Sequence, residues 1–326
     1  MLTTNSFRNW VPIARPTPAN NFIQRSNRKW LFIAHVVISA IGPRLGFFGA
    51  RVVGVMPNGH TLLKLNNGYA LGGKGTVLEL PRDRGIYEDV RRRGVWELEE
   101  SKFLARGLKN AYRNPQIQKV ALIDIGAHTG LVTLQTMNLS NTAAEVFLFE
   151  PVASHALAIK RNLRKLPNIH VCNFALSNKN GPATIFSQAS NRANTSLLKS
   201  VVPEINRIPT QVELVHTTTF FAKFLKNFDS YVIKCDIQGM DAQVLSKIPD
   251  YVWKNCELAV VEVWALNAIS KKHVDALFSM CQEFKIVGWI NNNVVEITQL
   301  SSVREFWLSK SGSYRNLVLS KTHFQD

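Results

Sequence analysis

The sequence predicts an α/β protein of the Rossmann-like, doubly wound class, with a mostly parallel sheet, an N-terminal extension and a small β-meander. Three observations predict this class. From residue 118 onward, short apolar strands alternate with helical segments, which is the pattern of a parallel sheet with right-handed crossovers. The first of these strands runs into a turn bracketed by glycines, and the second ends on an acidic residue. Both features indicate a ligand site at the carboxyl ends of the strands.

Three segments precede this alternation. Residues 1–29 are rich in Asn and Pro and poor in large aliphatic side chains, so we expect a mobile basic tail. Residues 30–50 contain an apolar segment that is shorter than the about 20 residues of a membrane span. It predicts either a helix packed on the domain or a peripheral or anchored contact with a membrane. Residues 51–117 predict an antiparallel meander with Asn-Gly turns, followed by one helix over residues 84–109.

Residues 118–326 predict one ligand-binding domain. Strands are expected at residues 119–125, 145–149, 169–173, 230–236, 257–264, 284–290 and near 315–320. Helices are expected at residues 130–137, 153–164, 217–226, 240–247 and 271–283. Residues 183–217 predict short strands and a polar loop, Ser190–Ser196, near the carboxyl edge of the sheet. We expect Asn194 and Ser196 to face the acceptor substrate, and an ordinary surface loop is the alternative.

The turn after the first strand favours a cofactor without phosphate groups. An apolar run ends at Asp124, and Gly126 and Gly130 then bracket Ala127 and His128. Dinucleotide turns usually carry Gly-x-Gly-x-x-Gly, because a pyrophosphate sits on the helix N-terminus. Here the acidic residue would repel a pyrophosphate and suit a cation. S-adenosylmethionine carries a sulfonium and an ammonium group, so the charge pattern favours a methyl donor over a nicotinamide cofactor. A helix cap at Asp124 is the structural alternative.

Two further strands end on charged residues. The second strand ends on Glu150 and Pro151, and an acidic residue at this place holds ribose hydroxyls in folds of this type. The alternative is an exposed strand end. The fourth strand ends with Lys234 and Asp236, which are two residues apart and therefore share one face. Charges so close to a buried strand are costly unless they are paired or functional. They predict either a site or a structural ion pair.

On these residues the sequence resembles the FkbM family of S-adenosylmethionine-dependent methyltransferases, over residues 80–320. The resemblance rests on Trp96-Glu97, Asp124–Gly130, Phe149–Pro151, Asn173–Ser177, Asn194–Ser196, Lys234–Leu245 and Val260–Val263. It implies S-adenosyl-L-methionine as cofactor, bound by Asp124, Gly126, Ala127, His128, Gly130, Glu150, Pro151, Ala175 and Asp236. Two residues depart from the family pattern. His128 stands where Asn is usual, and Gln238 replaces a Glu, which puts in doubt any role there that needs a negative charge, such as metal ligation.

The resemblance also implies methyl transfer to oxygen, on a sugar or another small-molecule hydroxyl. The reaction is an in-line displacement in which the protein supplies alignment, and a hydroxyl acceptor must lose its proton to a nearby base. Asp236 is the candidate base, with a contact to the ammonium group of the cofactor as the alternative. Lys234 would keep Asp236 ionised through its positive charge. We expect no metal site.

Composition leaves the compartment and one alternative acceptor open. The formal net charge is +16, and no acidic residue precedes Glu79. Such N-termini occur in organellar targeting peptides, beside membrane anchors and in nucleic-acid-binding tails. The four cysteines lack metal-ligand spacing, so we expect core thiols in a reducing compartment, either cytoplasmic or on a membrane facing the cytosol.

The basic net charge makes RNA methylation one alternative function. It is not favoured, because more than half of the net charge lies before Glu79 and not in interleaved basic and aromatic runs along the catalytic domain. A non-catalytic binding protein that retains the fold is another alternative. A nicotinamide dehydrogenase is the weakest, because the glycine spacing differs.

Overall fold

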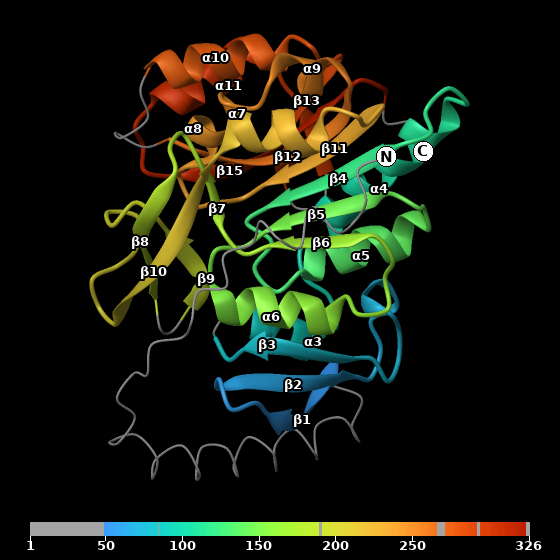
Figure 1. The fold of residues 1–326 in the computed structure, drawn as a ribbon, viewed down its shortest axis with the longest axis vertical. Coiled ribbons are helices and arrows are strands. Elements are labelled where there is room, and N and C mark those ends of the chain that lie inside the picture. The colour runs from blue at the N-terminus through green and yellow to red at the C-terminus, as the bar shows by residue number, and fades with distance from the viewer. Residues whose placement is uncertain (1–48, 84, 189–190, 266–270, 292–293, 324–326) are drawn as a thin grey trace.

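The computed structural model describes residues 49–83, 85–188, 191–265, 271–291 and 294–323. At its centre lies an eight-stranded sheet in the order β14-β13-β15-β12-β11-β4-β5-β6 (Figure 1). Its strands are β4 (Val120–Ile125), β5 (Glu145–Phe149), β6 (Ile169–Cys172), β11 (Ser230–Cys235), β12 (Cys256–Trp264), β13 (Ile286–Asn291), β14 (Val294–Ile297) and β15 (Tyr314–Ser320). The strands from β6 to β12 are parallel, and β15 runs antiparallel between β12 and β13. The predicted mostly parallel α/β sheet is confirmed.

The order of the strands creates a crevice at one edge of the sheet. From β4 the chain moves outward to β5 and β6, and it then returns to β11 on the other side of β4. Ligands bind in open α/β sheets where the crossovers diverge in this way, at the carboxyl ends of the strands. Lys234 on β11 is in register with Asp124 on β4, so the charged tips of the two strands end at the same level.

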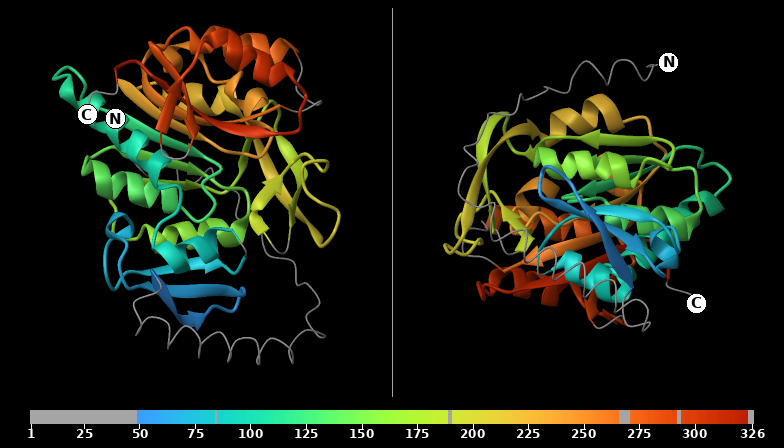
Figure 2. Two further views of the ribbon diagram at one scale, coloured as in Figure 1. Left: turned by 180° about the vertical axis from the view of Figure 1, so that it is seen from behind. Right: turned by 90° about the horizontal axis from the view of Figure 1, so that it is seen from below.

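Helices cover both faces of the sheet, as Figures 1 and 2 show. One face carries α4 (Leu98–Arg113), α5 (Leu131–Ser140) and α6 (Ala153–Asn162), and α3 (Ile86–Arg93) packs on the small N-terminal sheet described below. The other face carries α7 (Thr217–Phe220), the π-helix η3 (Phe221–Leu225), α8 (Asp241–Leu245), α9 (Asp250–Lys254), α10 (Lys271–Cys281) and α11 (Leu300–Leu308).

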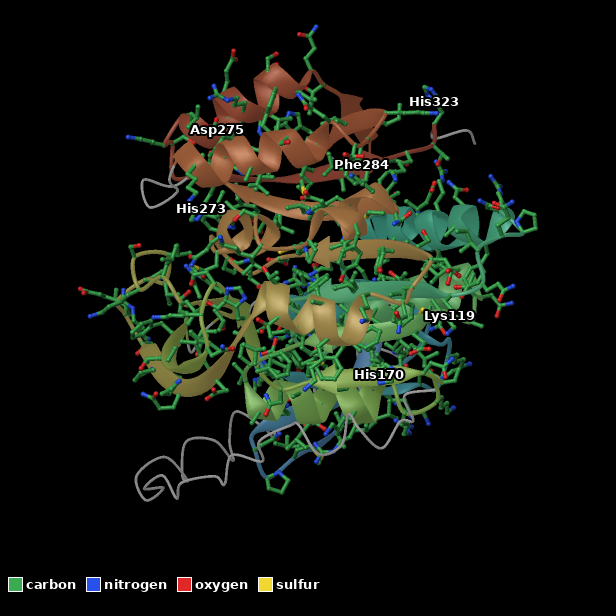
Figure 3. All side chains as sticks on the ribbon, turned by 45° about the horizontal axis from the view of Figure 1, so that its top comes forward. Lys119, His170, His273, Asp275, Phe284 and His323 are labelled. Carbon is green, nitrogen blue, oxygen red and sulfur yellow. The ribbon has the colours of Figure 1, made fainter. Side chains whose placement is uncertain are left out.

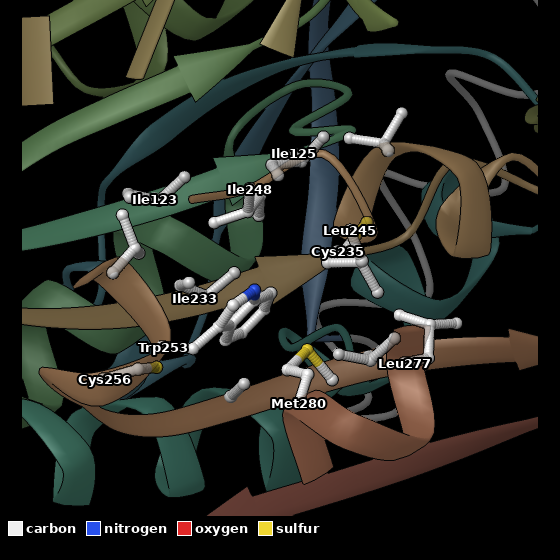
Figure 4. Close-up of a cluster of buried hydrophobic side chains, with 14 of the residues drawn as sticks. Ile123, Ile125, Ile233, Cys235, Leu245, Ile248, Trp253, Cys256, Leu277 and Met280 are labelled. Carbon is white, nitrogen blue, oxygen red and sulfur yellow. The ribbon is translucent and has the colours of Figure 1, made fainter. Parts of the chain in front are cut away.

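The apolar residues of the central strands alternate between two cores. Leu122 and Val232 pack on the α4 side, whereas Ile123 and Ile233 pack on the α10 side, because successive strand side chains point to opposite faces. Figure 4 shows the second core, where Trp253 lies among these isoleucines. All four cysteines of the chain are free and buried.

A small antiparallel sheet precedes the domain, as predicted. It consists of β1 (Ala50–Val55), β2 (His60–Leu65) and β3 (Val77–Pro81), with the short 3-10 helix η2 (Tyr69–Leu71) between the last two. The buried residue Glu79 of β3 connects this sheet to α6, because its backbone N–H donates to Asn162 Oδ1 at 2.7 Å and its carbonyl accepts from Asn162 Nδ2 at 3.0 Å. The division of the chain into domains stays a prediction.

Two predicted elements are wrong. The expected helix over residues 84–109 is divided into α3 and α4, because Gly94 adopts a left-handed conformation at φ +72° and a Cβ there would lie 2.5 Å from Asn67 Oδ1. The predicted polar loop contains strand β9 (Asn191–Ser196), which pairs with β8 (Gly181–Gln188). Together with β7 (Ala175–Ser177) and β10 (Arg207–His216) they form a second, four-stranded sheet. Pairing with β8 outweighs the turn-forming composition of this segment.

The basic tail and nearly all of the apolar segment lie outside the described residues, so their predictions are not tested. Within the parts of the chain that the structure describes, no helix has the length and apolar composition required to cross a membrane. Sequence analysis did not predict α9, α11 or β14.

Candidate active site

A cavity of about 360 Å³ lies at the carboxyl ends of β4, β5, β11 and β12. Ten of the twelve predicted site residues are on its wall: Gly126, Ala127, His128, Glu150, Pro151, Ala175, Asn194, Ser196, Lys234 and Asp236. Asp124 and Gly130 are not on the wall. The fold therefore brings segments that are up to 110 residues apart to one site, and the contact of each residue with a ligand stays a prediction.

The two glycines of the turn allow close approach of the backbone. Gly126 has φ +84°, and a Cβ at this residue would lie 1.9 Å from the carbonyl oxygen of Asp236. Gly130 precedes α5 with φ +77°, and a Cβ there would lie 2.7 Å from Leu163 Cδ1. Gly126 thus lets the tips of β4 and β11 meet, whereas Gly130 lets the start of α5 pack on the residue that follows α6.

Glu150 is buried at the tip of β5 and is fixed by backbone donors. Its Oε2 accepts a hydrogen bond from the His128 N–H at 2.9 Å, and its Oε1 accepts one from the Val152 N–H at 2.8 Å. Burial raises the pKa of Glu150 to about 7, although these bonds oppose the shift. A carboxylate accepts about four hydrogen bonds. Glu150 therefore keeps acceptor capacity for two hydroxyl groups.

A row of three histidines leads from Glu150 to the small N-terminal sheet, and sequence analysis did not predict the positions of His60 and His155 in it. The rings of His128 and His155 lie 4.3 Å apart, and those of His155 and His60 lie 5.8 Å apart. His155 Nδ1 is 3.6 Å from Glu150 Oε1, and His60 Nδ1 is 3.1 Å from Glu79 Oε1. Burial and the neighbouring His155 lower the pKa of His128 well below its usual value, so its ring is neutral at neutral pH. A buried polar chain thus connects the small N-terminal sheet to Glu150.

Lys234 is the cation at the centre of the site. Its Nζ lies 3.5 Å from Asp236 Oδ2 and 3.7 Å from Asp124 Oδ1. Thr133 on α5 donates to Asp124 Oδ2 at 2.6 Å. Burial favours the neutral amine, but the carboxylates of Asp236 and Asp124 outweigh it and raise the pKa of Lys234. Asp124 thus holds Lys234 from beneath the cavity wall, and the ion pair between Lys234 and Asp236 lies at the site itself.

Aromatic side chains of β12 and β15 form the opposite wall. Trp264 pairs with Tyr314 across the two strands, and their rings stack at 4.9 Å with an angle of 27°. Trp264 Nε1 donates to the carboxylate of Glu262, which lies two residues earlier on the same face of β12. Sequence analysis included Glu262 in the motif Val260–Val263 but missed both aromatic residues. The two-residue spacing was the only available signal for Trp264.

Gln238 bridges the two carboxylates of this wall. Its Nε2 lies 2.8 Å from Asp236 Oδ1 and 2.9 Å from Glu262 Oε2. A Glu at this position would place a third carboxylate against the other two, whereas the amide donates to both. Burial, followed by the nearby Asp236, raises the pKa of Glu262 well above its usual value. The departure from the family pattern at this position therefore suits its surroundings.

Three non-glycine residues on the cavity wall have a left-handed backbone: Glu97, His128 and Gln238, with φ of 43°, 50° and 53°. This conformation costs about 1 kcal/mol or more for residues with a Cβ, and it gathers at functional sites. Burial, followed by the charge of Asp236, raises the pKa of the Glu97 carboxyl to about 8. Glu97 is thus a fourth carboxyl group of the site, contributed from the start of α4.

The wall residues fit a polar ligand that carries positive charge. Asn194 Oδ1 and His128 Nε2 are buried without a hydrogen-bond partner among the described residues, so both are available to a ligand. Asp124 and Asp236 flank the ammonium group of Lys234, and Glu150 lies on the wall of the same cavity. S-adenosylmethionine, with its sulfonium and ammonium groups, matches this excess of carboxylates. Within the described residues no group of His, Cys, Asp and Glu is arranged to hold a metal ion.

Residues 124–282 match the family model described as the methyltransferase FkbM domain. This chain carries an FkbM methyltransferase domain. S-adenosylmethionine is the cofactor of the FkbM domain, as predicted. The matched residues include the tips of β4, β5, β11 and β12, whereas Glu97 and Tyr314 reach the site from outside them.

Solved structures similar to this chain are distant. The precorrin-6y C5,15-methyltransferase of Geobacter metallireducens is 12% identical, with a TM-score of 0.31 over 68% of this chain and 87% of that chain. The fibrillarin of Aeropyrum pernix with bound S-adenosyl-L-methionine is 9% identical, with a TM-score of 0.34 over 83% and 94%. An S-adenosylmethionine-dependent O-methyltransferase of Thermotoga maritima is 12% identical, with a TM-score of 0.33 over 81% and 79%. No curated protein matches the sequence.

Proposed function

We propose that this chain transfers the methyl group of S-adenosylmethionine to a hydroxyl group of a sugar or another small polyol. The observation that carries the proposal is the stack of Trp264 on Tyr314 beside the carboxylate of Glu262, on the wall of the same cavity as Glu150. A sugar offers an apolar C–H face, which packs on aromatic rings, and hydroxyl groups, which donate to carboxylates. The cavity volume of about 360 Å³ suits small ligands.

The residues divide into a donor end and an acceptor end. When bound, S-adenosylmethionine supplies a methyl group on a positively charged sulfur. At the donor end, Glu150 would accept hydrogen bonds from ribose hydroxyls, with its carboxylate held by the backbone of His128 and Val152. At the acceptor end, the rings of Trp264 and Tyr314 would align the acceptor and exclude water from one side.

Asp236 is the proposed base, because its carboxylate lies at the boundary between the two ends. Lys234 at 3.5 Å and Gln238 at 2.8 Å hold it in place, and it would take the proton that the acceptor hydroxyl loses. The substitution Asp236→Asn separates this role from a contact with the cofactor. If Asp236 acts as the base, this variant should have a lower kcat and an unchanged KM for the cofactor. If Asp236 instead contacts the ammonium group of the cofactor, the variant should have a raised KM for the cofactor.

The test uses the purified full chain with methyl-labelled S-adenosylmethionine and a panel of free sugars, glycosides, amines and short RNAs. We expect label in a sugar or polyol, as an ether that is stable to alkali. The variant Glu150→Ala should lose affinity for the cofactor in a direct binding measurement, and Lys179→Ala, an exposed position, should bind it as the wild type does. Label confined to RNA or amines, or no binding of the cofactor by the wild type, would overturn the proposal.

A further inference from the structure

A second cavity, of about 910 Å³, lies at the amino ends of the strands, at the opposite edge of the sheet from the active site. It lies between α4 and the ends of β12, β13 and β15. Six Lys and Arg side chains line it, together with one acidic residue, Glu257. We call this cavity the basic groove, and its six cationic residues are Lys102, Arg106, Lys109, Arg113, Lys285 and Lys321.

Helix spacing and strand order together bring these cations to one place. The four residues from α4 follow one another at intervals of four, three and four, so they share one face of the helix. This row is about 16 Å long at 1.5 Å per residue. Lys285 precedes β13 and Lys321 follows β15, and the two strands place them on the other wall. His323 lies at the rim, at the outer surface of the molecule (Figure 3).

The positive charge of the basic groove is largely uncompensated. Among the described residues, Lys109, Arg113 and Lys285 make no ion pair, and Lys102 pairs with Glu99 at 2.7 Å. The carboxylate of Glu257 accepts a hydrogen bond from Thr322 at 2.9 Å, and burial raises its pKa. Glu99 and Glu257 together do not balance the cations of the basic groove, and repulsion among the unpaired ones disfavours the folded state unless anions bind.

We propose that the basic groove binds a compact ligand that carries several phosphate groups. The guanidinium group of Arg and the ammonium group of Lys both bind phosphate through charged hydrogen bonds. The volume of the groove lies in the range of small-molecule sites. The described lining residues include no Phe, Tyr or Trp, which single-stranded nucleic acids use for base stacking. Among its described lining residues only Ala105 and Leu139 are apolar, too few to enter a lipid bilayer. The ligand is either free or the headgroup of a phosphorylated lipid.

The experiment measures binding of the full chain by calorimetry. The probes are inositol hexakisphosphate in solution, phosphatidylcholine vesicles with and without phosphatidylinositol bisphosphate, and a short single-stranded RNA. The groove variant combines Lys109→Gln, Arg113→Gln and Lys285→Gln. The control variant combines Lys160→Gln, Lys165→Gln and Lys179→Gln, which removes the same charge from exposed positions outside the groove. Cofactor binding by each variant verifies that its fold is intact.

We expect the wild type to bind the soluble polyphosphate, and the groove variant to bind it about 100-fold more weakly, because each cation near an anionic group contributes about fivefold. The control variant should bind as the wild type does, and binding should weaken as salt is added. Binding only to vesicles with the phosphorylated lipid identifies the headgroup as the source. The proposal is overturned if no phosphate probe binds, if both variants lose affinity equally, or if RNA binds more tightly through the groove.

Discussion

Replacing Gly126 with alanine is expected to disable the cofactor site by displacing the backbone of Asp236. The Cβ of alanine would lie 1.9 Å from the carbonyl oxygen of Asp236 and 2.9 Å from Ile237 Cγ2. Non-bonded atoms of this kind do not approach within 3.0 Å, so the tips of β4 and β11 must separate by about 1 Å. The left-handed conformation of Gly126, at φ +84°, adds a cost of its own for any residue with a Cβ.

The magnitude follows from these two contributions. A left-handed alanine costs about 1–2 kcal/mol, and an overpacked contact costs about 1–3 kcal/mol. We therefore expect a loss of about 2–5 kcal/mol in the free energy of unfolding. A displacement of about 1 Å in an aligned site lowers the rate of reaction by about 100-fold.

Gly73→Ala is the matched control, because Gly73 has nearly the same φ, +79°, and a Cβ there would meet no atom within 4 Å. Urea unfolding should show a loss of about 1–2 kcal/mol for this control, with wild-type affinity for the cofactor. Cofactor binding and methyl transfer should fall only in Gly126→Ala. The reasoning is refuted if Gly126→Ala binds the cofactor as tightly as Gly73→Ala, or if both variants lose the same stability.

Three further predictions follow from the site. The substitution Lys234→Met leaves the carboxylate of Asp124 buried without its cation, so urea unfolding should show a loss of about 3–5 kcal/mol; a loss below about 1 kcal/mol would contradict the ion pair. The pKa of Glu150 is about 7 in the folded chain and about 4.5 in the unfolded chain, so the folded chain binds the proton more tightly. The contribution of Glu150 to the free energy of unfolding should therefore fall from pH 5 to pH 7. Cofactor affinity should rise over the same range, because the ionised carboxylate accepts the hydrogen bonds of the ribose. The pH dependence of stability and that of cofactor affinity should both weaken in Glu150→Gln. If both stay as in the wild type, Glu150 is not the group that titrates. Trp264→Ala should raise the KM for the acceptor about tenfold, as expected for one lost aromatic contact, and leave the KM for the cofactor unchanged. A raised KM for the cofactor with an unchanged KM for the acceptor would show that the acceptor does not bind on this wall.

The donor end of the site was predictable from the sequence because each of its parts is local. A buried strand, the turn after it and an acidic residue at its end can each be recognised from a short stretch of sequence. From such stretches we predicted that Gly126, Glu150 and Asp236 lie at one edge of a sheet, and all three line the cavity. The strand order β6-β5-β4-β11 was not predicted, because the handedness of the crossovers leaves open on which side of β4 the chain returns. Predicting these three residues did not require knowing which distant segments pack together.

The aromatic wall, which is the proposed acceptor end, was not predictable, because it depends on pairing between distant strands. Tyr314 reaches Trp264 only because β15 enters antiparallel beside β12, and nothing in the residues around Tyr314 indicates this position. His60 likewise reaches His155 through the packing of the small sheet on α6. The strand at Asn191–Ser196 was missed for the opposite reason, because its local composition favours turns and a long-range pairing overrides it.

The position of β15 has a consequence for how the enzyme matures during synthesis. The strand lies inside the sheet, between β12 and β13, although both of those are made before it. A chain arrested before Tyr314 would already contain every donor-end residue, yet it would lack half of the aromatic stack and leave an open slot in its sheet. Such an intermediate could hold the cofactor before it could select an acceptor. On the proposed function, the wall that aligns the acceptor is therefore complete only once this last strand has entered the sheet.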